Sequence, residues 1–140
     1  MSFEGACHCG RIEVSFETTK APDRIQVRAC QCSFCTRHHG RTVSDPDGRV
    51  TFRAAPGALK RYRFATGSAD FLLCAECGTY MGVVMQADGK LYGIVNATGA
   101  GIEALASREP EPMDYSAETV EARTARRKRV WSPAVMLGSA

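Results

Sequence analysis

Long hydrophobic runs are absent from this sequence. Its longest apolar stretches span only a few residues, such as Phe71 to Ala75, whereas a helix needs about 20 apolar residues to cross a membrane. The segment Met1 to Gly5 also has neither the basic region nor the apolar region of a secretory signal. We therefore expect a protein that has no membrane span and a cytoplasmic location.

The residues that are present suit one folded domain. The chain has 140 residues, and 44% of them are apolar, which is enough to bury a core and too much for general disorder. The composition changes after about residue 107. Glu109 to Pro112 contains two prolines, which predict an extended segment that interrupts regular secondary structure. We expect a main domain over 1–110 and a C-terminal extension over 111–140 that packs on it.

Period-two alternation of apolar and polar residues predicts a mainly β, antiparallel fold. Asp45 to Gly48 and Ala87 to Lys90 carry turn signals, and the second of them predicts a hairpin. Ser116 to Arg129 predicts a short helix with Ser116 as its N-cap, in a tail that is otherwise irregular. Trp131 is read as a packing anchor. The expected strands are 11–17, 24–29, 49–53, 59–64, 69–73, 80–86 and 91–97.

No cysteine stands alone. The seven cysteines form three clusters, and an odd number leaves at least one thiol without a disulfide partner. Residues one or two positions apart are also poorly placed to bridge each other. Clustered cysteines in a reducing compartment favour a metal. We expect zinc as the metal, because thiolate-rich tetrahedral sites favour it, while the spacing alone also permits an iron–sulfur cluster. The clusters are Cys7 and Cys9, then Cys30, Cys32 and Cys35, then Cys74 and Cys77.

The two outer pairs share a feature that the triplet lacks. Gly10 and Gly78 directly follow the second cysteine of each pair, and glycine lets the backbone curl around a bound sulfur with φ > 0. Two such pairs supply four thiolates, which saturate one structural zinc. We therefore predict one site made of Cys7, Cys9, Cys74 and Cys77.

The triplet Cys30, Cys32 and Cys35 supplies three thiolates to a second zinc. His38 or His39 has acceptable spacing to close this site as Cys₃His, and spacing alone does not choose between the closed and the open form. An open site would bind a thiol as the fourth ligand and favour its thiolate. Three thiolates make zinc a weak source of hydroxide, so an open site indicates thiol chemistry rather than hydrolysis.

These clusters, in this order, resemble the glutathione-dependent formaldehyde-activating enzyme family, which includes centromere protein V-like members. The resemblance covers roughly residues 3–98. It implies a β-tent-like zinc-binding fold, with Cys7, Cys9, Cys74 and Cys77 on a structural zinc and Cys30, Cys32 and Cys35 on a catalytic one. The matching segments are Gly5 to Gly10, Cys30 to Cys35 followed by Gly40, Cys74 to Thr79, and Gly93 to Asn96.

The resemblance implies a carbon–sulfur lyase that joins a small thiol such as glutathione to a small aldehyde, formaldehyde in the family's name. The rival hypothesis is a non-catalytic zinc module that binds a protein or nucleic acid. The basic run from Arg126 to Arg129 is the sequence feature that favours nucleic acid, but we read it as the cationic end of a helix or a solvated face. The formal charge of +3 would fall to about zero with two zinc ions on seven thiolates. The family often has a histidine after a Pro-Pro pair in the tail, whereas Glu111 to Ser116 has none, which leaves the substrate open.

Overall fold

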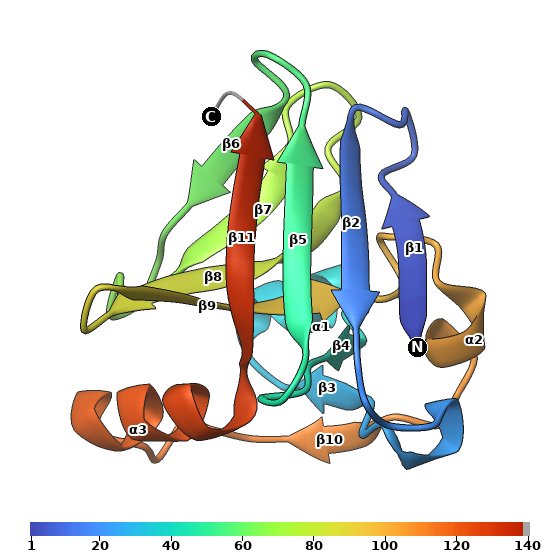
Figure 1. Cartoon of the computed structure of the whole chain (residues 1–140). Helices are drawn as coiled ribbons and strands as arrows, with labels where there is room; N and C mark the ends of the chain where they lie inside the picture. The colour runs from blue at the N-terminus through green and yellow to red at the C-terminus, as the bar shows by residue number, and fades with distance from the viewer. Residues whose placement is uncertain (139–140) are drawn as a thin grey trace.

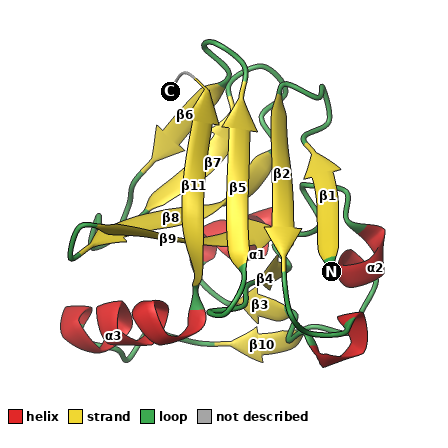
Figure 2. Cartoon of the chain, viewed as in Figure 1, coloured by secondary structure: helices red, strands yellow, loops and turns green. Residues whose placement is uncertain are grey.

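The structure, a computed structural model, describes residues 1–138, and it confirms the mainly β fold (Figures 1 and 2). Within that range, strands pair in the order β1-β2-β5-β11-β9-β4-β3-β10, and β8, β7 and β6 continue outward from β9. The strands are β1 Ser2–Ala6, β2 Ile12–Glu17, β3 Arg28–Cys30, β4 Thr42–Val43, β5 Arg49–Ala54, β6 Leu59–Tyr62, β7 Asp70–Cys74, β8 Tyr80–Ala87, β9 Lys90–Asn96, β10 Glu111–Met113 and β11 Ser132–Gly138. The helices are α1 Ser33–His38, α2 Glu103–Ala106 and α3 Val120–Val130, with a 3₁₀ turn at Pro22–Arg24.

The sheet folds over on itself around the main core. In Figure 1, β1, β2, β5 and β11 stand upright, while β8 and β9 cross behind them. The inward residues of β2 and β5 alternate with exposed or half-buried ones, as their period predicts. These inward side chains pack against β7, β8 and β9. The core includes Ile12, Val14, Phe16, Val50, Phe52, Leu72, Met81, Val84 and Val95.

The predicted hairpin is confirmed. β8 and β9 pair in register from Gly82 opposite Val95 to Ala87 opposite Lys90. The two residues between the strands, Asp88 and Gly89, both have positive φ, at 52° and 73°. That conformation suits a two-residue loop between twisted strands.

The strand predicted over 24–29 is wrong in its extent. Pro22–Arg24 forms a 3₁₀ turn, and only Arg28–Cys30 pairs as a strand. Ile25 and Val27 are still buried, as the alternation indicated. The Arg108 guanidinium donates to the carbonyl oxygens of Pro22 and Ile25, so a side chain takes the place of a neighbouring strand there.

The N-cap of the C-terminal helix, predicted at Ser116, lies three residues later. Thr119 is the N-cap of α3, and its hydroxyl accepts from the Ala122 N–H at 3.1 Å. The Ser116 N–H instead donates to the Asp114 carboxylate at 2.9 Å. Asp114 therefore closes a separate turn at Ser116, just before the helix.

Two parts of the C-terminal segment are strands that the sequence reasoning did not predict. β10 pairs with β3, and β11 pairs with β5, both in parallel rather than antiparallel fashion. β11 also pairs antiparallel with β9 through Ser132 and Pro133. It therefore lies inside the sheet, between β5 and β9.

Among residues 1–138, the helices are too short or too polar to span a membrane. Trp131 is buried with Tyr80, Val83 and Met85 in a second, smaller core. Its reading as a packing anchor is confirmed.

Candidate metal centres and the adjoining pocket

The two outer cysteine pairs meet in space. The Sγ atoms of Cys7, Cys9, Cys74 and Cys77 all lie within 4.8 Å of one another. The Cys9 sulfur lies 3.7 Å from that of Cys7 and 3.6 Å from that of Cys74. Four sulfurs around a tetrahedral zinc, with Zn–S bonds of about 2.3 Å, are separated by about 3.8 Å. The geometry of these four thiols therefore fits a zinc ion.

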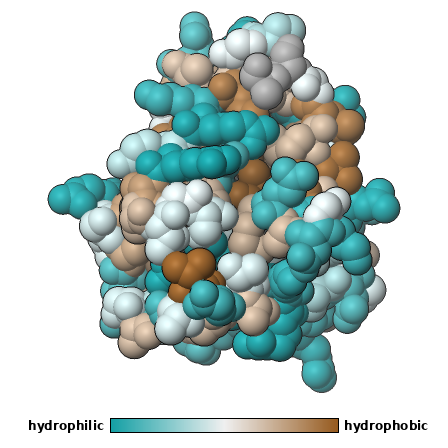
Figure 3. All heavy atoms as spheres, turned by 90° about the vertical axis from the view of Figure 1, so that its left-hand side faces the viewer, coloured by the Kyte–Doolittle hydropathy of each residue, from teal (hydrophilic) through white to brown (hydrophobic). Residues whose placement is uncertain are grey.

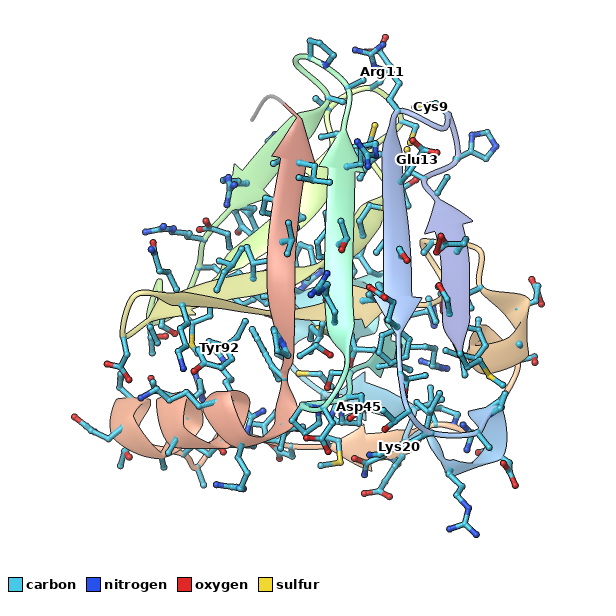
Figure 4. All side chains as sticks on the ribbon, in the orientation of Figure 1. Cys9, Arg11, Glu13, Lys20, Asp45 and Tyr92 are labelled. Carbon is cyan, nitrogen blue, oxygen red and sulfur yellow. The ribbon has the colours of Figure 1, made fainter. Side chains whose placement is uncertain are left out.

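Two loops bring these pairs together. Cys7 and Cys9 lie between β1 and β2, at the top of the view in Figure 4, where Cys9 is labelled. Cys74 ends β7, and Cys77 follows in the turn before β8. As the sequence predicts, the glycine after each pair has positive φ, 85° at Gly10 and 78° at Gly78. Each glycine N–H closes its turn by donating to the carbonyl oxygen of the first cysteine, at 3.0 and 2.8 Å.

The surroundings of this group favour thiolates at some positions. The Ile12 N–H donates to the Cys7 sulfur at 3.3 Å. The side chain of Thr79, 3.2 Å from the Cys77 sulfur, contributes most to lowering the pKa of Cys77 to about 5. The Arg11 N–H acts to lower the pKa of Cys9, but burial and the neighbouring Cys74 outweigh it and raise this pKa to about 11. Since the sulfurs share their protons unequally, a bound cation is what would let all four ionise together.

The middle triplet forms a second group. The Sγ atoms of Cys30, Cys32 and Cys35 lie within 4.8 Å of one another. Cys30 ends β3, and Cys32 is the N-cap of α1, where its sulfur accepts from the Cys35 N–H at 3.4 Å. This short helix therefore brings the third sulfur back toward the first.

Neither candidate histidine joins the triplet. Among residues 1–138, no ring nitrogen of His38 or His39 lies close enough to belong with the three sulfurs. The His38 ring instead packs on Phe34, with ring centroids 4.3 Å apart. His39 ends α1 in the left-handed conformation, at φ 50°. The described residues thus leave a three-sulfur group without a fourth His, Cys, Asp or Glu ligand.

The three sulfurs of the triplet compete for protons. Contacts with Cys30 and Cys35 lower the pKa of Cys32 to about 2, and the contact with Cys30 contributes most to raising that of Cys35. One thiolate is thus stabilised by two neighbouring thiols. A divalent cation would allow the remaining two to ionise, so this donor set also fits a metal with thiolate ligands.

A pocket of about 300 Å³ opens beside the triplet. Cys30 and Cys32 lie on its wall, and Phe64 and Phe71 form an apolar side. Another part of the wall comes from the C-terminal segment. It contains Asp114, Tyr115, Ser116, Arg123, Arg126 and Arg127.

The sequence reasoning missed this role of the basic run. Arg126 stacks 3.5 Å from the centre of the Tyr115 ring and pairs with Glu118 at 2.7 Å. Arg127 is buried, with its guanidinium 4.9 Å from the Trp131 ring centre. The i, i+4 spacing of Arg127 and Trp131 was the available signal, because such residues share a helix face.

An aromatic cluster lies beside the pocket and was also missed. The Phe34 ring lies within 6 Å, centroid to centroid, of Tyr62, Phe64, Phe71 and Tyr80. These residues come from α1, β6, β7, β8 and the loop after β6. Since these five aromatic residues are far apart in the sequence, no local pattern predicts the cluster.

The fold and the two sulfur groups define a mainly β protein with two cysteine centres that can hold metal ions. The chain belongs to the family described as glutathione-dependent formaldehyde-activating enzyme, whose sequence model matches residues 2–114. It is also similar to a crystal structure of a Rhodobacter sphaeroides protein, with 26% identity and a TM-score of 0.55, over 79% of this chain and 99% of that one. No curated protein matches the chain. α3 and β11 lie beyond the segment that the family model matches.

Proposed function

We propose that this protein is a zinc-dependent carbon–sulfur lyase. It adds a small thiol to a small aldehyde, or releases it, at the group formed by Cys30, Cys32 and Cys35. Family membership suggests glutathione and formaldehyde as the pair. The observation that carries the proposal is a three-sulfur group that has no fourth ligand among residues 1–138 and lies on the wall of a pocket.

The proposed reaction conserves atoms and electrons. The thiol sulfur forms a bond to the carbonyl carbon while the π bond of the C=O group opens and its electron pair moves to oxygen. The proton released by the thiol ends on that oxygen. The reverse reaction breaks the C–S bond and restores the thiol and the aldehyde, so no oxidant or reductant is consumed.

The cysteines would hold two zinc ions, one at Cys30, Cys32 and Cys35 and a structural one at Cys7, Cys9, Cys74 and Cys77. A Zn²⁺ ion with three thiolate ligands supplies a position for a fourth sulfur and favours loss of the proton from a thiol there. A cytoplasmic location, where thiols stay reduced, would suit both the ligands and the substrate.

The walls of the pocket support the same chemistry. Phe64 and Phe71 provide an apolar side that excludes water from the reacting carbon. Arg126 and Arg127 line the pocket together with Cys30. Their positive charges favour the thiolate form of a substrate over the thiol.

A non-catalytic zinc module that binds nucleic acid or a protein is the competing function. The basic run supports it weakly, because Arg126 and Arg127 line the pocket and Lys128 pairs with Asp88. Only Arg129 of the run is exposed. On the face seen in Figure 3, hydrophobic residues form small patches among hydrophilic ones rather than one broad surface for a protein partner. We therefore favour the lyase and do not propose nucleic acid as a partner.

Cobalt substitution tests the proposal. Adding glutathione to the cobalt-loaded protein should strengthen the sulfur-to-metal charge-transfer absorption. Cys32→Ser should abolish this response and any acceleration of adduct formation with formaldehyde, while the absorption from the four-sulfur group persists. His38→Ala and His39→Ala should leave the response intact. If several thiols leave the spectrum unchanged and a histidine variant alters it, the site is closed and the lyase proposal fails.

A further inference from the structure

A second, smaller cavity adjoins the pocket. It has a volume of about 60 Å³, and Cys30, Phe71, Tyr115, Arg126 and Arg127 line both spaces. We call it the inner recess. Residues that line the inner recess and not the larger pocket include Arg28, Cys35, Tyr80 and Trp131.

Two buried arginines on its wall lack a carboxylate partner. Arg28 is 6% exposed and Arg127 is 9% exposed. Arg28 donates to the Ser44 hydroxyl at 2.6 Å, and Arg127 donates to the Ser68 hydroxyl at 2.9 Å. Among residues 1–138, neither guanidinium forms an ion pair, whereas a buried charge is costly unless it is paired.

Two further donors at the inner recess are not fully satisfied. The Tyr80 hydroxyl and the Arg127 Nε are both buried without a well-formed hydrogen bond within residues 1–138, and the Tyr80 hydroxyl lies close to the Cys35 side chain. Buried polar groups in proteins are nearly always hydrogen-bonded. Positive charge and unused donors thus meet at one small space, which is the environment that an anionic acceptor requires.

A metal on the triplet would not satisfy these groups completely. Three thiolates on Zn²⁺ carry one net negative charge, whereas Arg28 and Arg127 carry two positive charges. The remaining positive charge would be offset by a substrate thiolate on the metal, so the unused buried donors, rather than a surplus of charge, call for a second acceptor. Neither arginine can lose its charge at neutral pH, because a guanidinium stays protonated in proteins.

We propose that the inner recess binds a carboxylate carried by the substrate close to its reacting sulfur or carbonyl carbon. This inference rests on the proposed function for the identity of the reacting molecule. The recess has a volume of about 60 Å³. This is roughly the volume of two water molecules in the liquid, at about 30 Å³ each, and it suits a group with two oxygen atoms such as a carboxylate. Either the thiol or the aldehyde can carry the acid group, as in 3-mercaptopropionate or glyoxylate.

The inner recess therefore favours short acids over glutathione. Both carboxylates of glutathione are separated from its sulfur by peptide units, so neither can lie as close to a sulfur held beside Cys30 and Cys35 as the carboxylate of a short thiol acid can. Arg127 and Trp131 also lie outside the segment that the family model matches. Arg28, Cys35 and Tyr80 of the recess lie within that segment.

Trp131 provides the measurement, since it is the single tryptophan of the chain and lines the recess. Its fluorescence is titrated in zinc-loaded protein with 3-mercaptopropionate and with the neutral 3-mercaptopropionamide. A charge-assisted hydrogen bond predicts that the acid binds at least about tenfold more tightly. A parallel titration compares glyoxylate with glyoxylamide, and the pair that shows the preference identifies which reactant carries the carboxylate.

Matched variants assign the preference to the recess. Arg127→Met and Tyr80→Phe should each reduce the preference for the acid, whereas Arg129→Met removes the same charge from the exposed side of the same helix and should retain it. Arg127→Met should change the stability of the ligand-free protein little. It loses the Ser68 hydrogen bond and the Trp131 contact, but it also removes a buried cation that has no ion-pair partner. If Arg127→Met does not fold, Tyr80→Phe alone decides, because it removes only one oxygen atom.

The outcomes separate this inference from the proposed function. Equal affinity for acids and amides in the wild type overturns the carboxylate site, even if cobalt absorption still responds to thiols. An acid preference that Tyr80→Phe and Arg127→Met leave unchanged also overturns it. If thiol-free propionate binds more tightly than propionamide while no thiol alters the cobalt spectrum, the carboxylate site stands and the lyase proposal fails.

Discussion

Replacing Cys77 with serine should destabilise the protein far more than replacing Cys35. Cys77 is half-buried, so the loss of its sulfur removes little packing. The group to which it belongs joins Cys9 to Cys74, which are 65 positions apart. Cys30 and Cys35, in contrast, are joined over a short stretch of chain.

Chain entropy gives the magnitude. A cross-link that closes a loop of this length stabilises the folded state by about 4 kcal/mol, against about 2 kcal/mol for the short loop of the triplet. A loss of about 4 kcal/mol lowers the Tm of a chain this size by on the order of 10 °C. The difference arises because the long loop restricts the unfolded chain more strongly.

Urea unfolding of zinc-loaded protein measures both losses. The three sulfurs left in Cys77→Ser still hold metal weakly, so the comparison needs a chelator concentration that spares the wild-type four-sulfur group. Cys35→Ser is the control, because it removes one ligand from the triplet. The same chelator empties the triplet in the wild type as well, so the loss in Cys35→Ser should lie below the value of about 2 kcal/mol for a metal-closed short loop. Equal losses of stability in the two variants would refute the division into a structural and a reactive centre.

Two further predictions concern metal content and acidity. Freshly purified protein should contain two zinc ions per chain, and mild chelation should remove the triplet's ion first; a maximum of one zinc by elemental analysis rules out two sites. Asp45→Asn should cost about 1–3 kcal/mol at pH 7, because the carboxylate accepts from the Thr18 hydroxyl at 2.7 Å and from the Asp47 N–H at 2.9 Å. Burial acts to raise the pKa of Asp45, but these hydrogen bonds outweigh it and lower the pKa below its ordinary value. The stabilisation is therefore present above the ordinary carboxyl pKa, about 3.9, and is lost as pH falls through the lower folded value. Urea unfolding of both proteins from pH 7 to pH 3 should show their difference shrinking, and a constant difference contradicts the assignment.

The sequence predicted those parts of the structure whose causes are local. The Asp88-Gly89 turn is confirmed because both residues tolerate positive φ. β2 and β5 are confirmed because each buries one face, which their alternation displays. Gly10 and Gly78 mark the cysteine turns for the same local reason.

The rest depends on partners that are distant in the sequence. β11 contains Pro133 and ends at Gly138, residues that usually weaken a strand, yet it pairs with both β5 and β9. The pocket required α3 to bring Arg127 beside Cys30. Neither arrangement leaves a periodic signal, and spacing could not decide whether His38 or His39 closes the triplet.

The position of β11 has a consequence for the order in which the chain folds. During synthesis, β11 emerges after the other ten strands have been made, yet it fills the interior of the sheet between β5 and β9. Until it arrives, those two strands expose unpaired edges, which are templates for pairing with other chains. Parallel pairing across such a long separation is also intrinsically slow. The nascent chain is therefore most vulnerable to aggregation just before its last strand is inserted, and protection by chaperones matters most at that stage.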